Sequence, residues 1–146
     1  MTGDESEIKI RRMIPADLPE ILRIDSILVG KKRAVTWQEK VETLWFTERP
    51  ALNFVAEVRD KVVGFMLGDV RGAEFGTPMC GWIDVIGVHP AWQRKGIGKR
   101  LVEAFCQWCQ SNQVRTRIII RQDDKRIQKF LVSVGFTRGE LVDFER

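Results

Sequence analysis

The chain has 146 residues, of which 44% are hydrophobic and 30% are charged, and its net charge is +4. This length and composition fit one globular domain with a full hydrophobic core, so we expect a single domain over residues 1–146. The small positive charge favours polyanionic partners without requiring one.

The sequence also argues against export and membrane insertion. Its first seven residues, MTGDESE, are polar and acidic, and no apolar run reaches the length of a membrane span. The three cysteines, an odd number, do not make a disulfide framework. We therefore expect a cytoplasmic protein with no membrane partner, in which residues 1–6 are disordered.

In the first half of the chain, the apolar pattern predicts a strand, two helices and a hairpin. Residues 8–12 alternate apolar and charged side chains, as a half-buried strand does. Capping boxes that begin at Asp17 and Thr36 each precede apolar residues at a helical period. Residues 53–70 then predict two strands joined by a tight turn.

The second half predicts alternating strands and helices. Residues 79–88 and 116–121 form strands, the second deeply buried beside a parallel neighbour, and residues 93–111 form a helix between them. A last helix is capped by one of the two aspartates at 123–124, and a final strand follows over residues 136–144. The complete order, βααβββαβαβ, indicates a mixed α/β sheet.

The segment GVHPAWQRKGIGKRL joins the third strand of the sheet to the helix after it. The first N–H groups of a helix have no partner within it, and the helix dipole adds positive charge there. Gly96 and Gly98 carry no Cβ that would keep a ligand away from these groups. Four cations surround them: Arg94, Lys95, Lys99 and Arg100. The segment predicts a phosphate or pyrophosphate site, although the bare pattern is equally compatible with a plain strand-to-helix joint.

Two segments resemble motifs of the GNAT superfamily of acyl-CoA-dependent N-acyltransferases. VHPAWQRKGIGKRL is similar to the motif that cradles the coenzyme A pyrophosphate, with Gln93, Gly96 and Gly98 at the motif positions. IQKFLVSVGF is similar to a second motif, an apolar helix that ends in Gly-Phe. The resemblance extends over nearly the whole chain in the order of its elements. It implies a GNAT-like fold, a mixed and mostly antiparallel central sheet flanked by helices, whose central strands splay apart.

The resemblance also implies a function and a set of cofactor contacts. An enzyme of this type moves an acetyl group from acetyl-CoA to a primary amine, of a small molecule or a protein, by direct attack in a ternary complex without a metal. The backbone of Ile86 and Val88 would pair with the pantetheine arm as an added strand. The backbone amides on the pyrophosphate would come from Arg94, Lys95, Gly96, Gly98 and Lys99. Asp124 occupies the position of the family's asparagine at the start of the last helix.

Transfer to an amine requires the neutral amine, and an alkyl ammonium has a pKa of about 10.4, so a general base should help. Asp84 is the first candidate, because strand alternation places it on the face of Trp82 and Ile86. Members of the family have a catalytic side chain at the position of Trp82 or of Asp84. Glu74, in the loop before this strand, is the second candidate. The alternative interpretation makes Asp84 the buried partner of an arginine and Glu74 a solvated loop charge.

The sequence departs from the family at the leaving group. Many members carry a Phe-Tyr pair whose tyrosine protonates the departing thiolate, whereas this chain has Phe130-Leu131 and no tyrosine. A thiol with a pKa of about 8.5 leaves as the thiolate without that acid. The departure leaves open a catalytically silent acyl-CoA-binding module as the alternative function. A nucleic-acid binder is disfavoured, because the cations adjoin glycines and do not form a stripe with stacking aromatics.

Three further features have structural interpretations. Cys106 and Cys109 form a C-x-x-C pair in mid-helix, which favours core packing over a metal or redox site. His89 precedes Pro90, which favours a loop position over catalysis. One strand follows Phe136, where the family commonly has two. The open sheet edge that results favours pairing with a second subunit, so we expect a homodimer.

Overall fold

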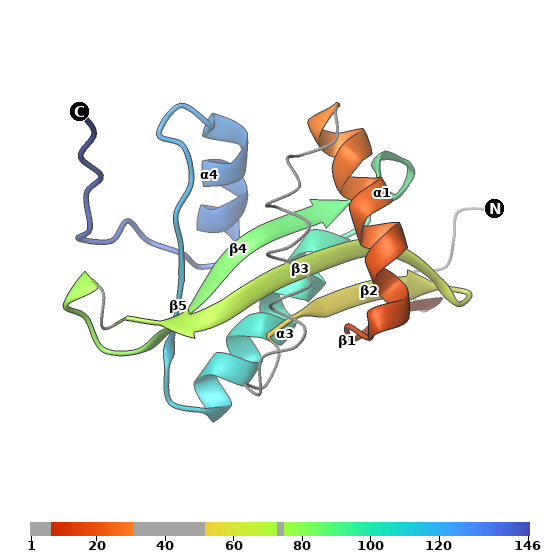
Figure 1. Cartoon of the computed structure of the whole chain (residues 1–146), viewed down its shortest axis with the longest axis horizontal. Coiled ribbons are helices and arrows are strands. Elements are labelled where there is room, and N and C mark those ends of the chain that lie inside the picture. The colour runs from red at the N-terminus through yellow and green to blue at the C-terminus, as the bar shows by residue number, and fades with distance from the viewer. Residues whose placement is uncertain (1–6, 31–51, 73–74) are drawn as a thin grey trace.

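The computed structural model describes residues 7–30, 52–72 and 75–146, and within these ranges five strands form one sheet (Figure 1). Their bounds are β1 Ile8–Arg12, β2 Phe54–Val58, β3 Lys61–Arg71, β4 Cys80–Val88 and β5 Arg115–Ile118. The spatial order follows the chain, with antiparallel pairing from β1 to β4 and parallel pairing between β4 and β5. This arrangement confirms the mixed, mostly antiparallel sheet.

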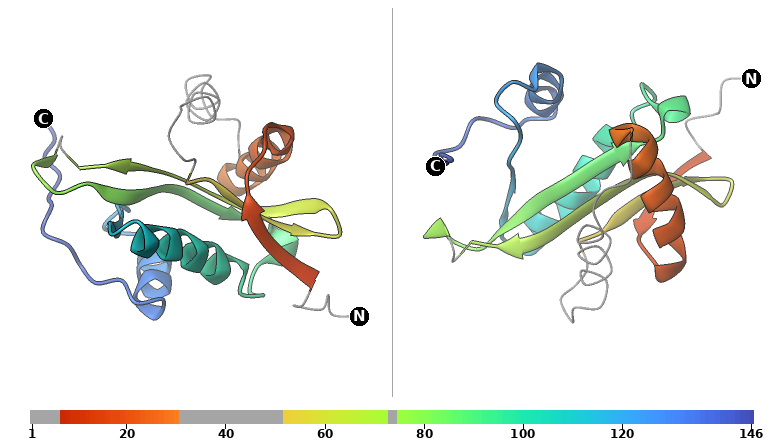
Figure 2. Two further views of the ribbon diagram at one scale, coloured as in Figure 1. Left: turned by 90° about the horizontal axis from the view of Figure 1, so that it is seen from below. Right: turned by 45° about the horizontal axis from the view of Figure 1, so that its top comes forward.

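Three α-helices flank the sheet in the described ranges: α1 Leu18–Val29, α3 Ile97–Ser111 and α4 Lys125–Ser133. α1 covers one face, whereas α3 and α4 lie on the other (Figure 2). Leu101, Val102 and Phe105 of α3 belong to a buried cluster with residues of β2, β3 and β4. Ile21 and Ile24 of α1 belong to a second cluster on the opposite face. No helix in the described part of the chain is long and apolar enough to cross a membrane.

An ion-pair network ties β1 to the start of α1. The guanidinium of Arg11 donates to both oxygens of Asp17 at 2.8 Å and to Glu57 of β2 at 2.9 Å. Burial raises the pKa of Asp17, but hydrogen bonds from Arg11 and the Ile14 N–H outweigh burial and hold this pKa below its ordinary value. The capping box predicted at Asp17 is wrong, because its carboxylate accepts from Ile14 and does not cap α1, which still begins at Leu18.

β4 separates from β5 partway along its length. Pairing between the two strands ends at Ile83 and Ile118, while β4 continues to Val88 beside β3 alone. In Figure 1 the chain beyond β5 diverges from β4 on its way to α4. The splayed central strands are therefore confirmed, and among the described residues one edge of β4 is open from residue 84 onward.

A β-bulge lies at the start of this open edge. Ile83 and Val85 pair with consecutive residues of β3, so Asp84 is the extra residue of β4. The bulge resets the alternation of faces, because Val85 packs with the α1-side cluster and Ile86 with the α3-side cluster. The prediction that Asp84 shares a face with Ile86 is therefore wrong, since it assumed an uninterrupted alternation.

The last predicted strand is not formed. Residues 136–146 are neither helix nor strand. Gly139 and Glu140 interrupt the β-forming pattern, and Glu140 forms an ion pair with Arg117. β5 is consequently the edge of the sheet and ends at Ile118, so it is shorter and less buried than predicted.

Three predictions lie outside the described residues. They are the disorder of residues 1–6, the helix that begins at Thr36, and the position of Glu74. Apart from the final strand, the other predicted strands and helices are present, in the predicted order.

Candidate functional site

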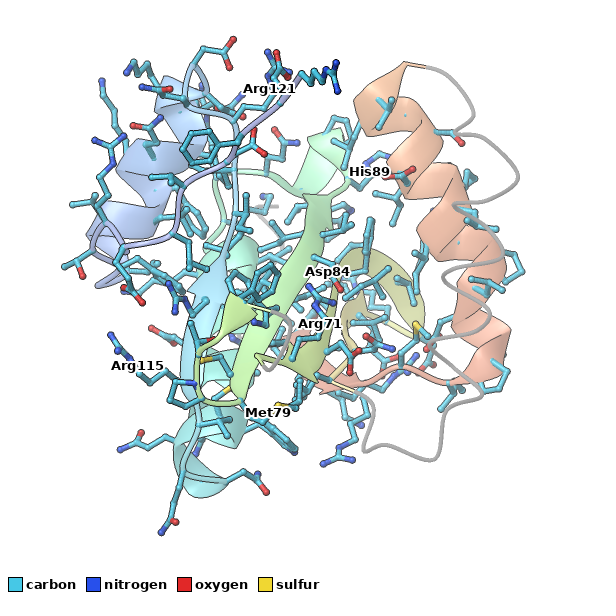
Figure 3. The ribbon with its side chains drawn as sticks, turned by 60° about the vertical axis from the view of Figure 1, so that its left-hand side comes forward. Arg71, Met79, Asp84, His89, Arg115 and Arg121 are labelled. Atoms are coloured by element: carbon cyan, nitrogen blue, oxygen red, sulfur yellow. The ribbon has the colours of Figure 1, made fainter. Side chains whose placement is uncertain are left out.

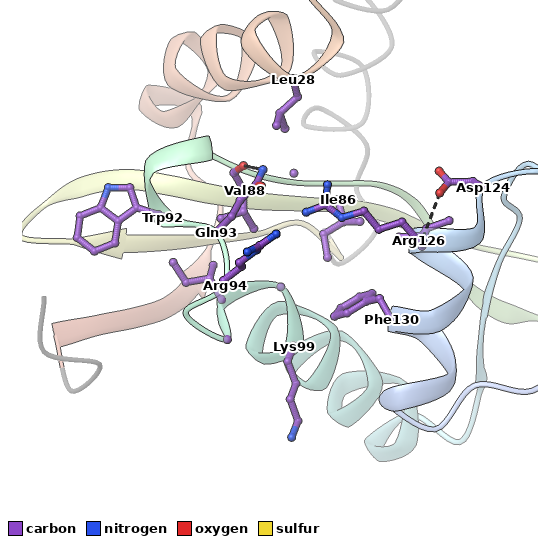
Figure 4. A pocket seen from close by; sticks show the side chains of 15 residues that line it. Leu28, Ile86, Val88, Trp92, Gln93, Arg94, Lys99, Asp124, Arg126 and Phe130 are labelled. Atoms are coloured by element: carbon purple, nitrogen blue, oxygen red, sulfur yellow. Dashed lines mark hydrogen bonds between the residues drawn. The ribbon is translucent and has the colours of Figure 1, made fainter. Parts of the chain in front are cut away.

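A cavity of about 700 Å³ lies at the open edge of β4, between this strand, the start of α3 and the start of α4 (Figure 4). Eight of the nine residues predicted to bind the cofactor line it: Ile86, Val88, Gln93, Arg94, Gly96, Gly98, Lys99 and Asp124. The ninth, Lys95, lines a neighbouring hollow of about 420 Å³ that shares Arg94, Gly96 and Lys99 with the cavity. The fold therefore gathers the candidates around one opening.

The main chain of β4 turns two of its residues toward this opening. The His89 N–H donates to the Val63 carbonyl of β3 at 2.8 Å. Because antiparallel strands bond to each other at every second residue pair, the main-chain groups of Ile86 and Val88 point away from β3, toward the open edge. The side-chain amide of Gln93 donates to the Val88 carbonyl at 3.0 Å, so Gln93 joins the following loop to the strand.

The loop between β4 and α3 is wound so that its N–H groups converge. Arg94 and Gly96 both adopt the left-handed conformation, with φ of 63° and 79°, and such a sequence of conformations forms a concave nest of N–H groups. α3 therefore begins at Ile97, four residues later than predicted, and no side chain caps it. By contrast, Asp124 caps α4, because its Oδ1 accepts from the Ile127 N–H at 3.1 Å. The uncapped amides of α3 border the cavity.

Gly98 lies in the first turn of α3 and faces the cavity. A Cβ at this position would meet the ring of Phe130 at 3.6 Å, which is an ordinary contact. At Gly87, in contrast, a Cβ would meet Phe65 and Leu28 at 2.7 and 2.8 Å. Packing within the described chain therefore does not require glycine at position 98, and its absent side chain leaves the amides of the helix start accessible.

The cavity also has lining residues that the sequence did not indicate: Leu28, Gly87, Trp92, Ile97, Arg126, Ile127 and Phe130. Arg126 adds a cation from α4, opposite α3 (Figure 4). Arg126 lies four residues before Phe130, which places both on one face of α4, and this spacing could have indicated Arg126 from the sequence. Lys99 contributes differently, because its side chain extends away from the cavity and its ammonium lies 4.0 Å from Glu103.

Asp84 and Arg71 form an ion pair at the bulge (Figure 3). The guanidinium donates to the two carboxylate oxygens at 2.6 and 3.1 Å, and 12% of the Asp84 side chain is exposed. The Arg71 carbonyl in turn accepts from the indole N–H of Trp82 at 3.2 Å. The arginine partner that the alternative interpretation gave Asp84 is therefore present. A carboxylate has about four acceptor sites, so the pair leaves Asp84 able to accept from a further donor.

The cysteines and the histidine have the surroundings that the sequence predicted. Cys109 is buried in the α3-side cluster and Cys106 packs against it, which confirms core packing. Burial raises the pKa of the Cys109 thiol. His89 lies beyond β4, where its Nδ1 accepts from the Ala91 N–H at 3.1 Å. In the ranges that the structure describes, no three acidic, histidine or cysteine side chains are grouped as metal ligands would be.

Residues 19–136 of the chain match the model of the acetyltransferase (GNAT) family. One curated relative is a mycothiol acetyltransferase of Amycolatopsis mediterranei (strain U-32), which is 33% identical over 100 residues. The match covers 66% of this chain and 33% of that protein, so this chain spans about a third of the relative's length.

Solved structures of acetyltransferases have the same fold. A possible acetyltransferase from Clostridium difficile 630 matches with a TM-score of 0.81 and 22% identity, over 95% of this chain and 96% of that chain. The aminoglycoside N-acetyltransferase AAC(6')-Iy, in complex with CoA, matches with a TM-score of 0.80 and 19% identity, over 95% and 93% of the two chains. At these identities the likeness shows the fold alone.

The Gly98→Ala substitution tests the open start of α3. Alanine favours a helix over glycine by about 1 kcal/mol, so the melting temperature should stay unchanged or rise. The methyl group would cover amides that face the cavity, so the affinity for coenzyme A should fall about tenfold or more by calorimetry, as for the loss of one charge-assisted hydrogen bond. Gly139→Ala, outside the cavity, is the control and should leave this affinity unchanged. Unaltered affinity in Gly98→Ala would contradict the assignment of these amides.

Proposed function

Because the chain belongs to the acetyltransferase (GNAT) family, we propose that it transfers an acetyl group from acetyl-CoA to the primary amine of a small molecule or a protein. The observation that carries this proposal is the cavity at the open edge of β4, which combines an extended main chain with the uncapped start of α3. The extended pantetheine arm of coenzyme A fits the main chain of β4, and its diphosphate fits the start of α3. The named relatives support acetyl transfer and leave the acceptor open.

Acetyl-CoA supplies the thioester carbonyl that the amine attacks. The amides proposed to hold its diphosphate are those of Arg94, Lys95, Gly96, Gly98 and Lys99. Ile86 and Val88 offer main-chain groups to the pantetheine arm, and Gln93 keeps the loop fixed to the strand between these two sites. The second oxygen of Asp124 is proposed to accept from an amide N–H of the arm, since the first caps α4. An arm bound in this way leads from the start of α3 toward the bulge.

We propose Asp84 as the group that accepts the ammonium proton, directly or through water. It lies at the bulge, where β4 and β5 begin to part, and the amine is proposed to approach it from the α1 side of the sheet. Arg71 fixes the carboxylate in one orientation, and the acceptor sites that remain on its oxygens face away from that pair. Glu74, outside the described residues, remains the second candidate.

The position of the family's tyrosine is occupied by Leu131, which is buried. The thiolate is proposed to leave without a protein acid, because the ordinary pKa of a thiol, about 8.5, makes it an adequate leaving group. The same leucine, together with the ion pair that engages Asp84, supports the second candidate function, a catalytically silent acyl-CoA-binding module.

Measurement of binding and turnover separates these functions. Calorimetry with coenzyme A tests binding, and release of free thiol from acetyl-CoA tests transfer across a panel of peptides, amino acids, polyamines and aminoglycosides. We expect micromolar binding and thiol release with at least one amine. Binding without thiol release for any amine would support the silent module. No binding at millimolar coenzyme A would contradict both proposals.

The Asp84→Asn substitution tests the general base. The amide keeps the shape of the side chain but cannot take a proton, so kcat/KM should fall about 10²- to 10⁴-fold. The affinity for coenzyme A should stay within about threefold, because Asp84 does not line the cavity. Asp123→Asn, an exposed partner of Arg121, is the matched control. Full turnover in Asp84→Asn would remove Asp84 from the mechanism.

We also propose a homodimer that forms through the open edge of β5. This strand pairs on one side with β4, and exposed apolar side chains lie near its end and in the C-terminal segment, with Ile119, Val142 and Phe144 exposed by 66%, 77% and 90%. Pairing with a second copy would cover such an edge. Sedimentation should give a dimer at micromolar concentration, which Ile119→Lys should dissociate. A monomer of the unmodified chain would contradict this proposal.

A further inference from the structure

Two arginines face each other across the cavity. Arg94 extends from the loop before α3, and Arg126 extends from the first turn of α4 on the opposite wall (Figure 4). Figure 4 shows both side chains directed into the space between the two helices. They come from segments about 30 residues apart in the sequence, which the fold brings to one opening.

Neither guanidinium has a partner among the described residues. Six other arginines of the described chain form ion pairs with carboxylates: Arg11, Arg23, Arg59, Arg71, Arg117 and Arg121. Asp124 is the acidic residue of the cavity wall, and one of its oxygens is engaged by the Ile127 N–H. Two like charges directed at the same space repel each other. An anion placed between them would convert this repulsion into two charge-assisted contacts.

The other cations of the loop are directed elsewhere. The Lys95 ammonium lies 5.7 Å from the centre of the Trp92 ring, and the Lys99 ammonium lies near Glu103. The amides of α3 reach a bound diphosphate from one side only, so its oxygens on the other side need donors from the opposite wall. The rigid fork of an arginine suits two such oxygens at once.

Resting on the proposed function, we infer that Arg126 binds the diphosphate of coenzyme A from the side of α4, opposite the amides of α3 and beside Arg94. The cap at Asp124 fixes the first turn of α4 and thereby the point from which Arg126 extends. The bound diphosphate would then join α4 to α3 across the cavity that both helices line. α4 becomes part of the cofactor site, and not only a cover for the sheet.

Calorimetry with coenzyme A on three variants tests this inference. Arg126→Met keeps an unbranched apolar stem and removes the guanidinium with its charge, so the dissociation constant should rise about 10- to 100-fold. Arg126→Lys keeps the charge without the planar guanidinium, so its dissociation constant should lie between those of Arg126→Met and the unmodified chain. Lys129→Met, an exposed cation of α4 that does not line the cavity, should stay within about twofold.

Salt dependence separates a phosphate contact from a structural role. If Arg126 contacts the diphosphate, the affinity of Arg126→Met for coenzyme A should depend less steeply on salt concentration than that of the unmodified chain. Amide hydrogen exchange in residues 125–133 should also slow on binding in the unmodified chain and less so in Arg126→Met. Unchanged affinity in Arg126→Met, or a loss with the same salt dependence, would overturn the inference while leaving the proposed function intact. Failure of the unmodified chain to bind coenzyme A would instead remove the proposed function.

Discussion

Main-chain hydrogen-bonding groups need partners, and along one edge of β4 beyond Ile83 no strand of the described chain provides them. The cavity lies at this opening, with the bulge at one end of the open edge and the uncapped start of α3 near the other. If β5 followed β4 to its end, Ile86 and Val88 would be paired and the space between β4 and α4 would be filled. The parting of two parallel strands thus leaves an extended backbone available to a ligand.

The positive charge around the opening results from where the fold places particular arginines, more than from the net charge of the chain. The net charge of +4 is modest, and six arginines of the described chain are paired with nearby carboxylates. Arg94 and Arg126, which form no ion pair with the described residues, lie on opposite walls of the same cavity. An anion that enters between the walls meets these charges together with the dipole of α3, in a partly enclosed space where their effect is least screened.

Sequence reasoning located the part of the site that is continuous in the chain. Gln93 to Lys99 lie together because they are consecutive in the loop and first residues of α3, so the motif that they resemble was enough to indicate them. Arg126 was missed because its approach to Arg94 depends on how α4 packs on α3. The bulge at Asp84 was missed because periodicity assumes a regular strand, and one extra residue resets every face beyond it. The final strand was predicted wrongly for another reason: Gly139 and Glu140 interrupt the apolar pattern, and β propensity is a weak guide over so short a segment.

The bond from Gln93 to the Val88 carbonyl has a consequence for how far a ligand reaches. It removes one acceptor at the end of β4, so an extended arm has fewer alternative registers along the edge. From Val88 to Asp84 the strand rises about 13 Å, at roughly 3.3 Å per residue. If an arm is bound as proposed, with one end held beside α3, its length would decide whether the reactive tip reaches the bulge, and a shorter carrier would stop before it.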